Sequence, residues 1–263
     1  MKYWLQEIKE IEKDNINSAT FITFKAIDLI EQMAQKESEN DLKKAFALLK
    51  NSHPMMAVLY NFCLLGEDFL KKHSKDNLKY FCERFKKDFK KANETVIEKA
   101  SKELRNIQTV LTHSFSSLVF QAILNSYETN KNIKVICTES RPKNEGVILA
   151  EKLKQKGIKT ILITDASAPY FVKKCDKILI GADGVSKDYL VHKIGTLGIA
   201  LAAKNFSKEI ISLAPKIKFW PKNYKIPKEE PKNPKEVTDK NLNVVNLYFD
   251  QTPKDLISKF ITD

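Results

Sequence analysis

Apolar positions in the first hundred residues recur every three or four residues, which is the period of an amphipathic helix. Asn17 or Ser18 is expected to cap one of these helices, because their side-chain oxygens accept from free N–H groups at a helix start. Proline fits the first turn of a helix, so His53-Pro54 is expected to restart the chain there. The expected helices cover residues 2–13, 19–33 and 41–50.

A longer apolar stripe runs from Asp76 to Leu104 and contains neither proline nor glycine. At ~1.5 Å per residue this length predicts a single helix of about 40 Å. We expect such a helix to act as a scaffold or an interface strut. Its apolar positions are Leu78, Phe81, Phe85, Phe89, Ala92, Val96, Ala100 and Leu104.

After residue 105 the pattern changes to short runs rich in isoleucine and valine that alternate with helical stretches. This alternation predicts an α/β fold with a parallel sheet covered on both faces, preceded by the all-helical part. We place the two domains at residues 1–105 and 106–263. The expected strands cover 107–111, 133–137, 159–163, 177–180 and 209–213, and the expected helices cover 115–129, 144–156, 168–174 and 192–204.

Polar residues follow four of the expected strands. In parallel sheets of this kind, ligands bind outside the carboxyl ends of the strands. The polar segments therefore predict where the functional site lies. They are residues 112–114, 138–142, 164–165 and 181–184.

The last fifth of the chain carries a different signal. Residues 216–240 hold eight lysines, four prolines and four acidic residues, which is typical of a surface loop or linker. An apolar run over 244–249 follows, and Thr252 is expected to cap a closing helix.

The composition indicates a folded protein and gives no sign of a membrane-spanning or secreted one. Hydrophobic residues make up 43% of the 263 residues, which is enough for a sizeable core. No run approaches the ~18 apolar residues that span a bilayer, and charged residues from Glu7 onward interrupt any signal sequence. We expect a soluble, cytoplasmic protein. The cysteines lie too far apart for a zinc site or a disulfide framework, so we expect reduced, buried thiols and no metal or cofactor.

The net charge of +12 favours acidic partners through electrostatic steering. Only three of the 45 basic residues are arginine, the usual bidentate reader of phosphate and base edges. A solvated lysine-rich surface and a nucleic-acid patch both fit this balance. The chain has no zinc motif, recognition helix or RNA-binding aromatic pattern.

Six segments follow one order along the chain: LTHSFSS (111–117), TESRP (138–142), ITDASAPYF (163–171), ILIGADGV (178–185), HKIGT (192–196) and NLYFDQTPKDLI (246–257). Together they resemble the superfamily of the regulatory subunits of eukaryotic translation initiation factor 2B. That superfamily also contains ribose-1,5-bisphosphate isomerase and methylthioribose-1-phosphate isomerase. The resemblance is strong over about residues 105–257.

The resemblance implies a helical domain joined by a long helix to a Rossmann-like domain that dimerises, with a sugar-phosphate or nucleotide pocket between the domains. In the isomerase members, a cysteine and an aspartate move hydrogen between the first two carbons of a phosphorylated aldose, which becomes a ketose. Asp183 matches that aspartate, and Lys193 matches the lysine of the family's Asn-Lys-Ile-Gly-Thr run. Arg141 matches the arginine after Glu-Ser.

Several positions depart from the pattern of the enzymes. Ser114 stands at the cysteine position, and a serine hydroxyl does not ionise near neutral pH without a base. His192 replaces the asparagine, and His53 replaces an arginine that contacts phosphate in the enzymes. The family's Arg-Gly-Ala element is matched only by residues 17–19.

Each candidate in the later strands has a functional and a structural interpretation. Asp183 is either a general base or the cap of the turn at Gly184. Lys193 either binds an anion at the start of its helix or is a solvated lysine. Arg141 is a phosphate ligand or a strand-end residue before proline.

Other candidates lie at or near the ends of the expected strands. Ser114 is expected to hydrogen-bond a ligand rather than act as a nucleophile, because no His/Asp relay is visible. His192 is a candidate phosphate donor that replaces the missing asparagine and titrates near pH ~6–7. His113 is expected to orient backbone, Asp165 to meet a ligand hydroxyl, a dimer mate or a structural donor, and Gly195 to allow close packing. The expected ligand-binding set is Ser18, His53, Ser114, Arg141, Asp183, His192 and Lys193.

Two functions from different classes fit these residues. The missing thiol favours a non-catalytic regulatory protein like initiation factor 2B, which forms a homodimer, binds a sugar phosphate or nucleotide and contacts a translation factor or RNA. The alternative is a divergent aldose–ketose isomerase of the ribose-1,5-bisphosphate type. In that case Asp183 is the base, supported by Ser114 or His192.

Overall fold

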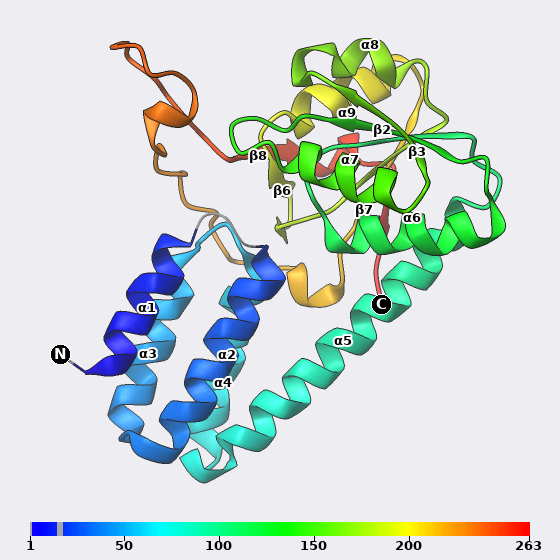
Figure 1. The fold of residues 1–263 in the computed structure, drawn as a ribbon. Coiled ribbons are helices and arrows are strands. Elements are labelled where there is room, and N and C mark those ends of the chain that lie inside the picture. The colour runs from blue at the N-terminus through cyan, green and yellow to red at the C-terminus, as the bar shows by residue number, and fades with distance from the viewer. Residues whose placement is uncertain (1, 15–17) are drawn as a thin grey trace.

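The computed structural model describes residues 2–14 and 18–263, and its first part is a helical bundle (Figure 1). Ser18 caps the second helix as expected, because its Oγ accepts from the backbone N–H of Phe21 at 3.3 Å. Asn17, the other candidate cap, lies outside the described residues. The helices are α1 (Tyr3–Lys13), α2 (Ala19–Lys36), α3 (Glu39–Ser52), α4 (Ala57–Lys72) and α5 (Leu78–Glu103).

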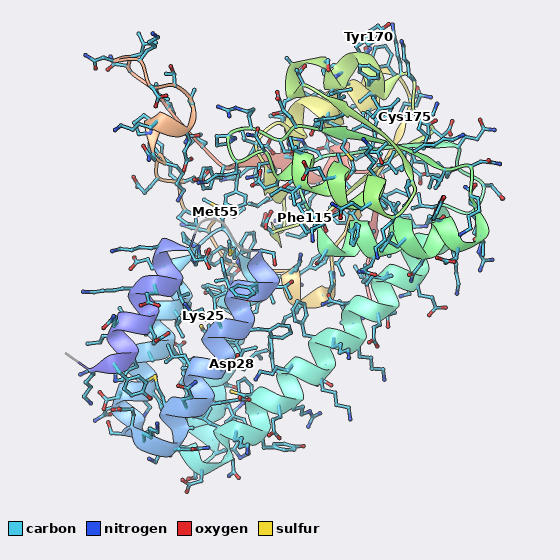
Figure 2. All side chains as sticks on the ribbon, viewed as in Figure 1. Lys25, Asp28, Met55, Phe115, Tyr170 and Cys175 are labelled. Atoms are coloured by element: carbon cyan, nitrogen blue, oxygen red, sulfur yellow. The ribbon has the colours of Figure 1, made fainter. Side chains whose placement is uncertain are left out.

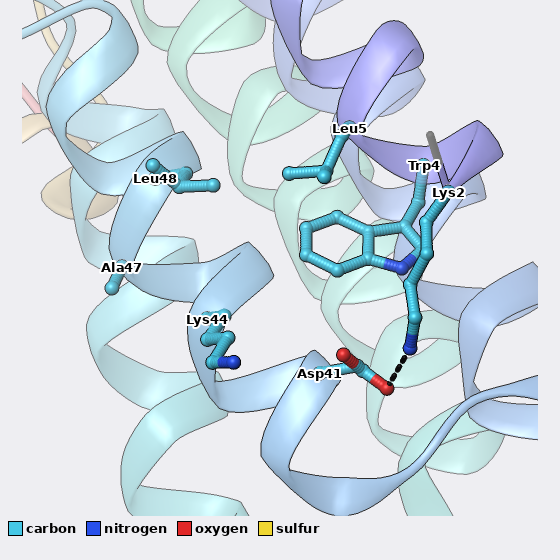
Figure 3. Close-up of a pocket in the computed structure, with 7 residues that line it drawn as sticks. All are labelled: Lys2, Trp4, Leu5, Asp41, Lys44, Ala47 and Leu48. Carbon is cyan, nitrogen blue, oxygen red and sulfur yellow. Dashed lines mark hydrogen bonds and ion pairs between the residues drawn. The ribbon is translucent and has the colours of Figure 1, made fainter.

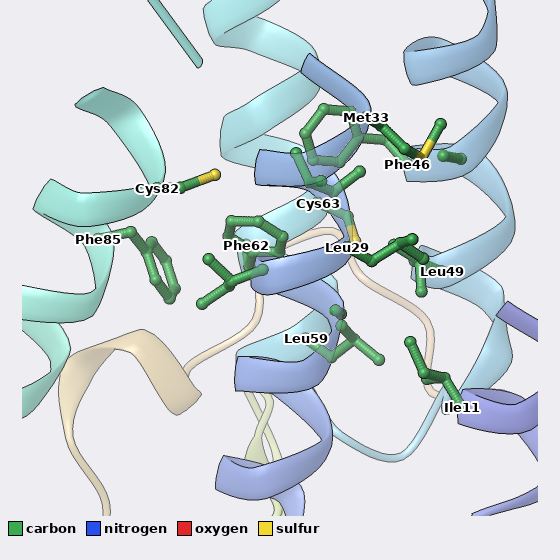
Figure 4. Packing of buried hydrophobic residues seen from close by; sticks show 14 of the residues in the cluster. Ile11, Leu29, Met33, Phe46, Leu49, Leu59, Phe62, Cys63, Cys82 and Phe85 are labelled. Carbon is green, nitrogen blue, oxygen red and sulfur yellow. The ribbon is translucent and has the colours of Figure 1, made fainter. Parts of the chain in front are cut away.

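The bundle has a core of its own, in which aromatic rings from α3, α4 and α5 meet (Figure 4). Phe62 of α4 is fully buried, and its ring centroid lies 5.8 Å from that of Phe46 and 5.0 Å from that of Phe85. A third ring, Phe81, lies 5.8 Å away in a stacked arrangement. Aromatic pairs at these distances add favourable ring geometry to the burial of apolar surface. Phe62 therefore ties three helices together.

The helix expected to restart at His53-Pro54 begins instead at Ala57, so this prediction places its start too early. The intervening turn is held by contacts from the other part of the chain. The Ala57 N–H donates to the Asp183 carbonyl at 2.9 Å, and the Tyr224 hydroxyl donates to the Pro54 carbonyl at 3.0 Å. Helix α4 thus begins where its first N–H group finds an acceptor outside the bundle.

Helix α5 runs through both parts of the molecule (Figure 1). Its first half contributes Phe85 and Phe89 to the core of the bundle, and its second half contributes Val96 and Ala100 to a core against the sheet. A 3-10 turn at Lys75–Asn77 precedes the helix. The prediction of one long helix is therefore confirmed.

The main sheet has six parallel strands in the order β3-β2-β1-β4-β7-β9. Helices α5, α6 and α7 pack against one face, and α8 and α9 pack against the other. The predicted α/β fold is therefore confirmed. The strands are β1 (Thr109–Thr112), β2 (Lys134–Thr138), β3 (Lys159–Ile163), β4 (Lys177–Ile180), β7 (Glu209–Leu213) and β9 (Lys259–Ile261), and the helices are α6 (Ser117–Thr129), α7 (Glu145–Gln155), α8 (Ala168–Val172) and α9 (Thr196–Asn205).

The order of the strands reverses at β1, which lies between β2 and β4. The chain winds outward from this point in both directions, so the loops that follow β1 and β4 separate to opposite sides of the sheet. Ligands bind at such switch points, outside the carboxyl ends of the strands. His113 and Ser114 follow β1, and Gly181 to Asp183 follow β4.

The sequence pattern does not predict a second sheet, which is antiparallel and has the order β5-β6-β8. Its strands are β5 (Gly184–Val185), β6 (Tyr189–Lys193) and β8 (Phe249–Pro253). Because residues 189–193 pair with 249–253, the helix expected over 192–204 begins only at Thr196. Pairing with a distant segment outweighs the local helical pattern there.

The closing helix expected after Thr252 is wrong. Thr252 lies within β8, and a 3-10 turn at Lys254–Leu256 and strand β9 follow it. Asp250 of β8 instead caps another helix, since its Oδ2 accepts from the N–H groups of Gly195 at 2.9 Å and Leu197 at 3.0 Å, at the start of α9. The Thr252 hydroxyl donates to the other oxygen of Asp250 at 2.9 Å.

Residues 216–240, called the strap below, form the expected loop and contain two short 3-10 turns. Trp220 of the strap packs with Met55, Ala57 and Val191. Figure 2 shows Met55 between the helical bundle and the strands. The strap, the bundle and β6 therefore share one apolar contact.

All four cysteines are free and buried, as expected. Burial raises the pKa of the Cys137 thiol to about 12 and that of Cys175 to about 11, so both remain thiols at neutral pH. Within residues 2–14 and 18–263, no helix combines the length and the apolar character that crossing a membrane requires. The same residues contain no group of three His, Cys, Asp or Glu side chains that suits a metal ion.

The packing of Phe62 predicts a large effect on stability. Replacing it by alanine (Phe62→Ala) is expected to lower the free energy of unfolding by ~3–5 kcal/mol, because a buried aromatic ring is lost and a cavity is left. Phe21→Ala is the matched control, since the Phe21 side chain is 52% exposed, and it is expected to change stability by less than ~1 kcal/mol. Chemical denaturation measures both, and equal losses in the two variants would contradict the packing argument.

Candidate functional site

The loops after β1, β2 and β6 are joined by the side chain of His113, which is buried. Its Nε2 donates to the Ile194 carbonyl at 2.8 Å, because a carbonyl oxygen only accepts. Its Nδ1 therefore carries the lone pair and accepts from the Thr138 hydroxyl at 2.6 Å. Burial lowers the pKa of His113 below its ordinary value, so the ring is neutral at pH 7. His113 orients backbone and fixes the relative positions of three strand ends.

Ser114 follows His113 in a left-handed backbone conformation with φ of 65°. Non-glycine residues rarely adopt this conformation, and here a hydrogen bond holds it, from the Ser114 N–H to Ser140 Oγ at 2.8 Å. The described residues provide no hydrogen bond to the Ser114 hydroxyl. Ser114 is 9% exposed, so its hydroxyl is almost buried and is left for another partner.

Asp165 organises the loop after β2. Its two carboxylate oxygens accept from the N–H groups of Ser140 at 2.8 Å and Arg141 at 2.7 Å. Ser140 has φ of 62°, so the loop makes a tight left-handed turn at this point. Asp165 therefore accepts from structural donors, which was one of the interpretations expected for it.

Asp183 lies after β4, beside the switch point, and is half-buried. Its backbone is fixed on both sides, by its N–H to the Val191 carbonyl and its carbonyl to the Ala57 N–H, each at 2.9 Å. Its carboxylate accepts no hydrogen bond from the described residues, so it does not cap the turn at Gly184. Burial raises the pKa of this carboxyl, and the charges of Lys218 and Lys193 oppose the rise.

Gly184 is explained by close packing instead. A Cβ atom at this position would lie 2.1 Å from the ring of Trp220. The strap therefore presses its indole ring directly onto the backbone beside Asp183.

Lys218 is a member of the site that sequence reasoning missed. It is buried, and its Nζ donates to the Ala182 carbonyl at 2.6 Å, next to Asp183. Burial lowers the pKa of Lys218, and the charge of Asp183 raises it. The sequence signal for its burial is weak: Lys218 lies between Ile217 and Phe219, but Lys225 of the strap also lies between two residues of the hydrophobic class.

Lys193 stands at the end of β6 and not at the start of a helix, so its expected position is corrected. Its Nζ forms an ion pair with Glu145 Oε1 at 2.5 Å and lies 5.0 Å from the centre of the Tyr248 ring. The side chain is only 6% exposed, so it is not the solvated lysine of the alternative interpretation. The position of the Lys193 ammonium group is therefore set by the pairing of β6 with β8 and not by the start of a helix.

His192, beside Lys193 on β6, is buried and held in one tautomer. The Thr196 hydroxyl donates to the Lys193 carbonyl at 2.7 Å, so it accepts from His192 Nδ1 at 3.0 Å. The lone pair is then on Nε2, which would lie 3.4 Å from a Cβ at Gly181. Burial lowers the pKa of His192 well below its ordinary value, and the nearby His113, Lys193 and Lys218 act in the same direction.

Arg141 and its neighbour Lys143 bind the strap. The Arg141 guanidinium donates to the Glu236 carbonyl at 2.6 Å, and Lys143 Nζ pairs with Glu236 Oε1 at 2.6 Å. The Tyr248 hydroxyl also donates to the Glu236 carboxylate, at 2.7 and 2.8 Å. The carbonyl and the carboxylate of Glu236 are therefore hydrogen-bonded or ion-paired to the two basic side chains that follow β2.

Two of the expected ligand-binding residues belong to the bundle. His53 is buried with its Nε2 2.7 Å from the Ile11 carbonyl, to which it donates. Ser18 caps α2. Neither side chain hydrogen-bonds to the residues at the strand ends. Asp183 lies close to His192 and Lys193, because its N–H donates to the Val191 carbonyl, whereas Ser114 is held by Ser140.

Two cavities lie away from these residues. One, of about 460 Å³, is bounded by α1 and α3 and lined by Trp4, Leu5, Lys44 and Leu48, with Lys2 paired to Asp41 at its edge (Figure 3). The other, of about 200 Å³, lies between α5 and α6. Neither is lined by Asp183 or its neighbours.

Comparisons with known proteins place these features in a family. The Initiation factor 2 subunit family matches residues 14–263. The chain is 31% identical over 245 residues to ribose 1,5-bisphosphate isomerase of Methanocaldococcus jannaschii, covering 89% of this chain and 79% of that protein. It is 28% identical to the enzyme of the same name from Archaeoglobus fulgidus, covering 100% and 89%. The crystal structure of the Pyrococcus horikoshii translation initiation factor eIF-2B superposes with a TM-score of 0.87 at 28% identity, covering 99% of this chain and 95% of that one.

These relatives correct the function that the sequence favoured. The serine at position 114 indicated a non-catalytic regulatory protein, but relatives that span most of the chain are named as ribose 1,5-bisphosphate isomerases. The comparisons favour the alternative, a sugar-phosphate isomerase. The family match covers nearly the whole sequence, and the fold is that of the superposed structure, so the chain belongs to the Initiation factor 2 subunit family.

Proposed function

We propose that this protein is an aldose–ketose isomerase that acts on a phosphorylated pentose of the ribose 1,5-bisphosphate class. The observation that carries the proposal is the Asp183 carboxylate, which has a raised pKa and no hydrogen-bond partner among the described residues, at the switch point of a parallel sheet. The isomerase names of the relatives support the same class of reaction.

Isomerisation moves the hydrogen on the second carbon of the cyclic sugar phosphate to the first carbon. The bond between the first carbon and the ring oxygen breaks and that oxygen gains a proton, while the hydroxyl on the second carbon loses its proton and becomes a carbonyl. The sugar is neither oxidised nor reduced overall, so no external electron acceptor is required. Asp183 holds and returns a proton during this exchange, for which a carboxyl with a raised pKa is suited. The nearby ammonium groups of Lys218 and Lys193 attract the anionic substrate.

Ser114 and His192 surround this chemistry without acting as nucleophiles. The Ser114 hydroxyl donates to, or accepts from, the sugar, because it has no partner among the described residues and does not ionise near neutral pH. The neutral His192 accepts a hydrogen bond at Nε2. We assign Arg141 and Lys143 to phosphate recognition, because their donors suit phosphate oxygens. Both donors now contact Glu236 of the strap, so a substrate phosphate would replace these contacts.

We also propose that the chain forms a homodimer through the edge of the main sheet. Strand β3 is the last strand on its side, and Ile161 and Leu162 are 39% and 47% exposed. Successive residues of a strand point to opposite faces, so both faces of this edge are uncovered. Ile148 of the adjacent helix α7 is 46% exposed and extends the apolar patch. A translation-factor or RNA partner stays a prediction from the resemblance to initiation factor 2B, and the net charge of +12 would speed such an encounter.

The isomerase proposal is tested with ribose 1,5-bisphosphate as substrate and ribulose 1,5-bisphosphate as the measured product. Wild-type protein is expected to catalyse the conversion, and Asp183→Asn is expected to lower kcat/KM by at least ~100-fold, the typical contribution of a positioned acid or base. Asp188→Asn, in the exposed turn between β5 and β6, is the matched control and is expected to retain activity. Absence of turnover by the wild type, or full activity of Asp183→Asn, would contradict the proposal.

The dimer is tested by sedimentation of the wild type, whose chain mass is 30.2 kDa, and of Leu162→Lys. The variant is expected to sediment as a monomer, because it places a charge in the proposed apolar contact. Leu201→Lys on α9, a residue that is 52% exposed, is expected to leave the dimer intact. A monomeric wild type excludes the proposed interface.

The buried imidazoles predict how stability depends on pH. The folded-state pKa values of His53, His113 and His192 are all lowered by burial, so the unfolded chain binds protons first as the pH falls through ~6.5. The histidines therefore make the free energy of unfolding decrease from pH 7.5 to 5.5. His192→Asn is expected to reduce this slope by up to ~1.4 kcal/mol per pH unit, measured by chemical denaturation at each pH. His73→Asn, at an exposed position, is the control, and an equal change in both variants would refute the assignment.

A further inference from the structure

A polar notch lies between α5 and α6, on the surface where the connecting helix meets the α/β part. Its volume is about 200 Å³, and Ser101, Arg105, Asn125, Ser126 and Thr129 contribute to its lining. Nothing in the proposed isomerase reaction uses these residues. The notch is at the amino end of β1, because Arg105 precedes that strand, whereas Asp183 lies at the carboxyl ends.

A buried hydroxyl without a partner marks the inner wall of the notch. Ser126 is 1% exposed, and none of the described residues forms a hydrogen bond with its Oγ. The neighbouring hydroxyls are different, since Ser101 donates to the Ile97 carbonyl at 2.7 Å and Thr129 donates to the Ser126 carbonyl at 3.2 Å. Buried polar atoms in folded proteins nearly always have a partner, so the Ser126 hydroxyl is a donor that awaits an acceptor.

A guanidinium group without a counter-ion lies at the mouth of the notch. Arg105 forms no ion pair or hydrogen bond through its side chain with any described residue. The other charges at the mouth compensate each other, because Lys102 Nζ pairs with Glu98 Oε1 at 2.8 Å. The uncompensated charge is therefore positive, and a guanidinium offers paired N–H donors whose spacing matches two oxygens of a phosphate group.

The size of the notch limits what it can hold. Pockets for nucleotides and other drug-sized ligands measure roughly 300–1,000 Å³, which exceeds the volume of this notch. A single phosphate group with its first waters fits. We propose that the notch binds a small tetrahedral oxyanion, either free phosphate or the phosphate end of a small ester, between Arg105 and Ser126. Such an anion would bridge the end of α5 and the face of α6.

The test uses backbone amide NMR of the full-length protein at constant ionic strength, with chloride as the balancing anion. Inorganic phosphate and glycerol 3-phosphate are titrated separately. The amides of residues 101–106 and 125–130 are expected to shift and saturate with at least one of the two anions. The anion that binds more tightly identifies free phosphate or the ester as the preferred source.

Variants distinguish this site from the proposed isomerase site. Arg105→Gln is expected to weaken binding at these amides at least ~10-fold, and Ser126→Ala to weaken it less, because one charged contact is worth more than one neutral hydrogen bond. Arg84→Gln is the matched control, since Arg84 lies on the exposed surface of α5, the helix that ends just before Arg105, and pairs with Asp88. Its affinity is expected to equal that of the wild type.

Two results would overturn the proposal: no saturable shift at these amides with either anion, or unchanged affinity in Arg105→Gln. Ser126→Ala removes only an unpartnered hydroxyl and is expected to fold. If Arg105→Gln does not fold, Ser126→Ala decides the question, and an anion affinity equal to that of the wild type would then contradict the proposal. Isomerase activity is measured in parallel. Loss of anion binding at the notch with activity retained separates this site from the one around Asp183.

Discussion

The continuity of α5 is the constraint on which the rest of the structure depends. One face of this helix belongs to the bundle core over its first half and to the sheet core over its second half. At its end, Glu103 accepts from Lys177 of β4 at 3.1 Å and from Lys259 of β9 at 2.5 Å. These contacts fix the helix to two strands of the sheet. The bundle therefore has a defined position relative to the strand ends, which allows α4 to reach the loop of Asp183.

The candidate site is built from buried neutral groups that hold backbone in place, with few charges left free. His113 and His192 are fixed in single tautomers by a carbonyl and by a hydroxyl that has itself donated elsewhere. Lys193 forms an ion pair with Glu145, and Arg141 donates a hydrogen bond to the strap. The carboxylate of Asp183 and the hydroxyl of Ser114 remain without partners among the described residues. This contrast directs attention to these two side chains more strongly than their position in a motif does.

The order of elements and most strand positions could be predicted, because apolar periodicity reports local structure. Strands β3, β4 and β7 lie where the isoleucine-rich runs predict them. The second sheet could not be predicted, since β6 is defined by pairing with a segment about sixty residues away. The burial of Lys218 depends in the same way on where the strap folds. The serine at the family's cysteine position led the functional interpretation away from an enzyme. The missing thiol is visible in the sequence, whereas the buried environment of Asp183 is visible only in the structure.

One hydrogen bond joins the helical bundle to the loop that carries Asp183. Helix α4 has no side-chain cap, and its first N–H group is directed at the carbonyl of Asp183. The peptide dipoles of α4 sum to a partial positive charge of about half an elementary charge at this end. This partial charge faces the backbone of Asp183, the residue to which the isomerase proposal assigns the acid–base role. A tilt of α4 would shift this loop directly, so the position of the Asp183 carboxylate is coupled to the position of the bundle.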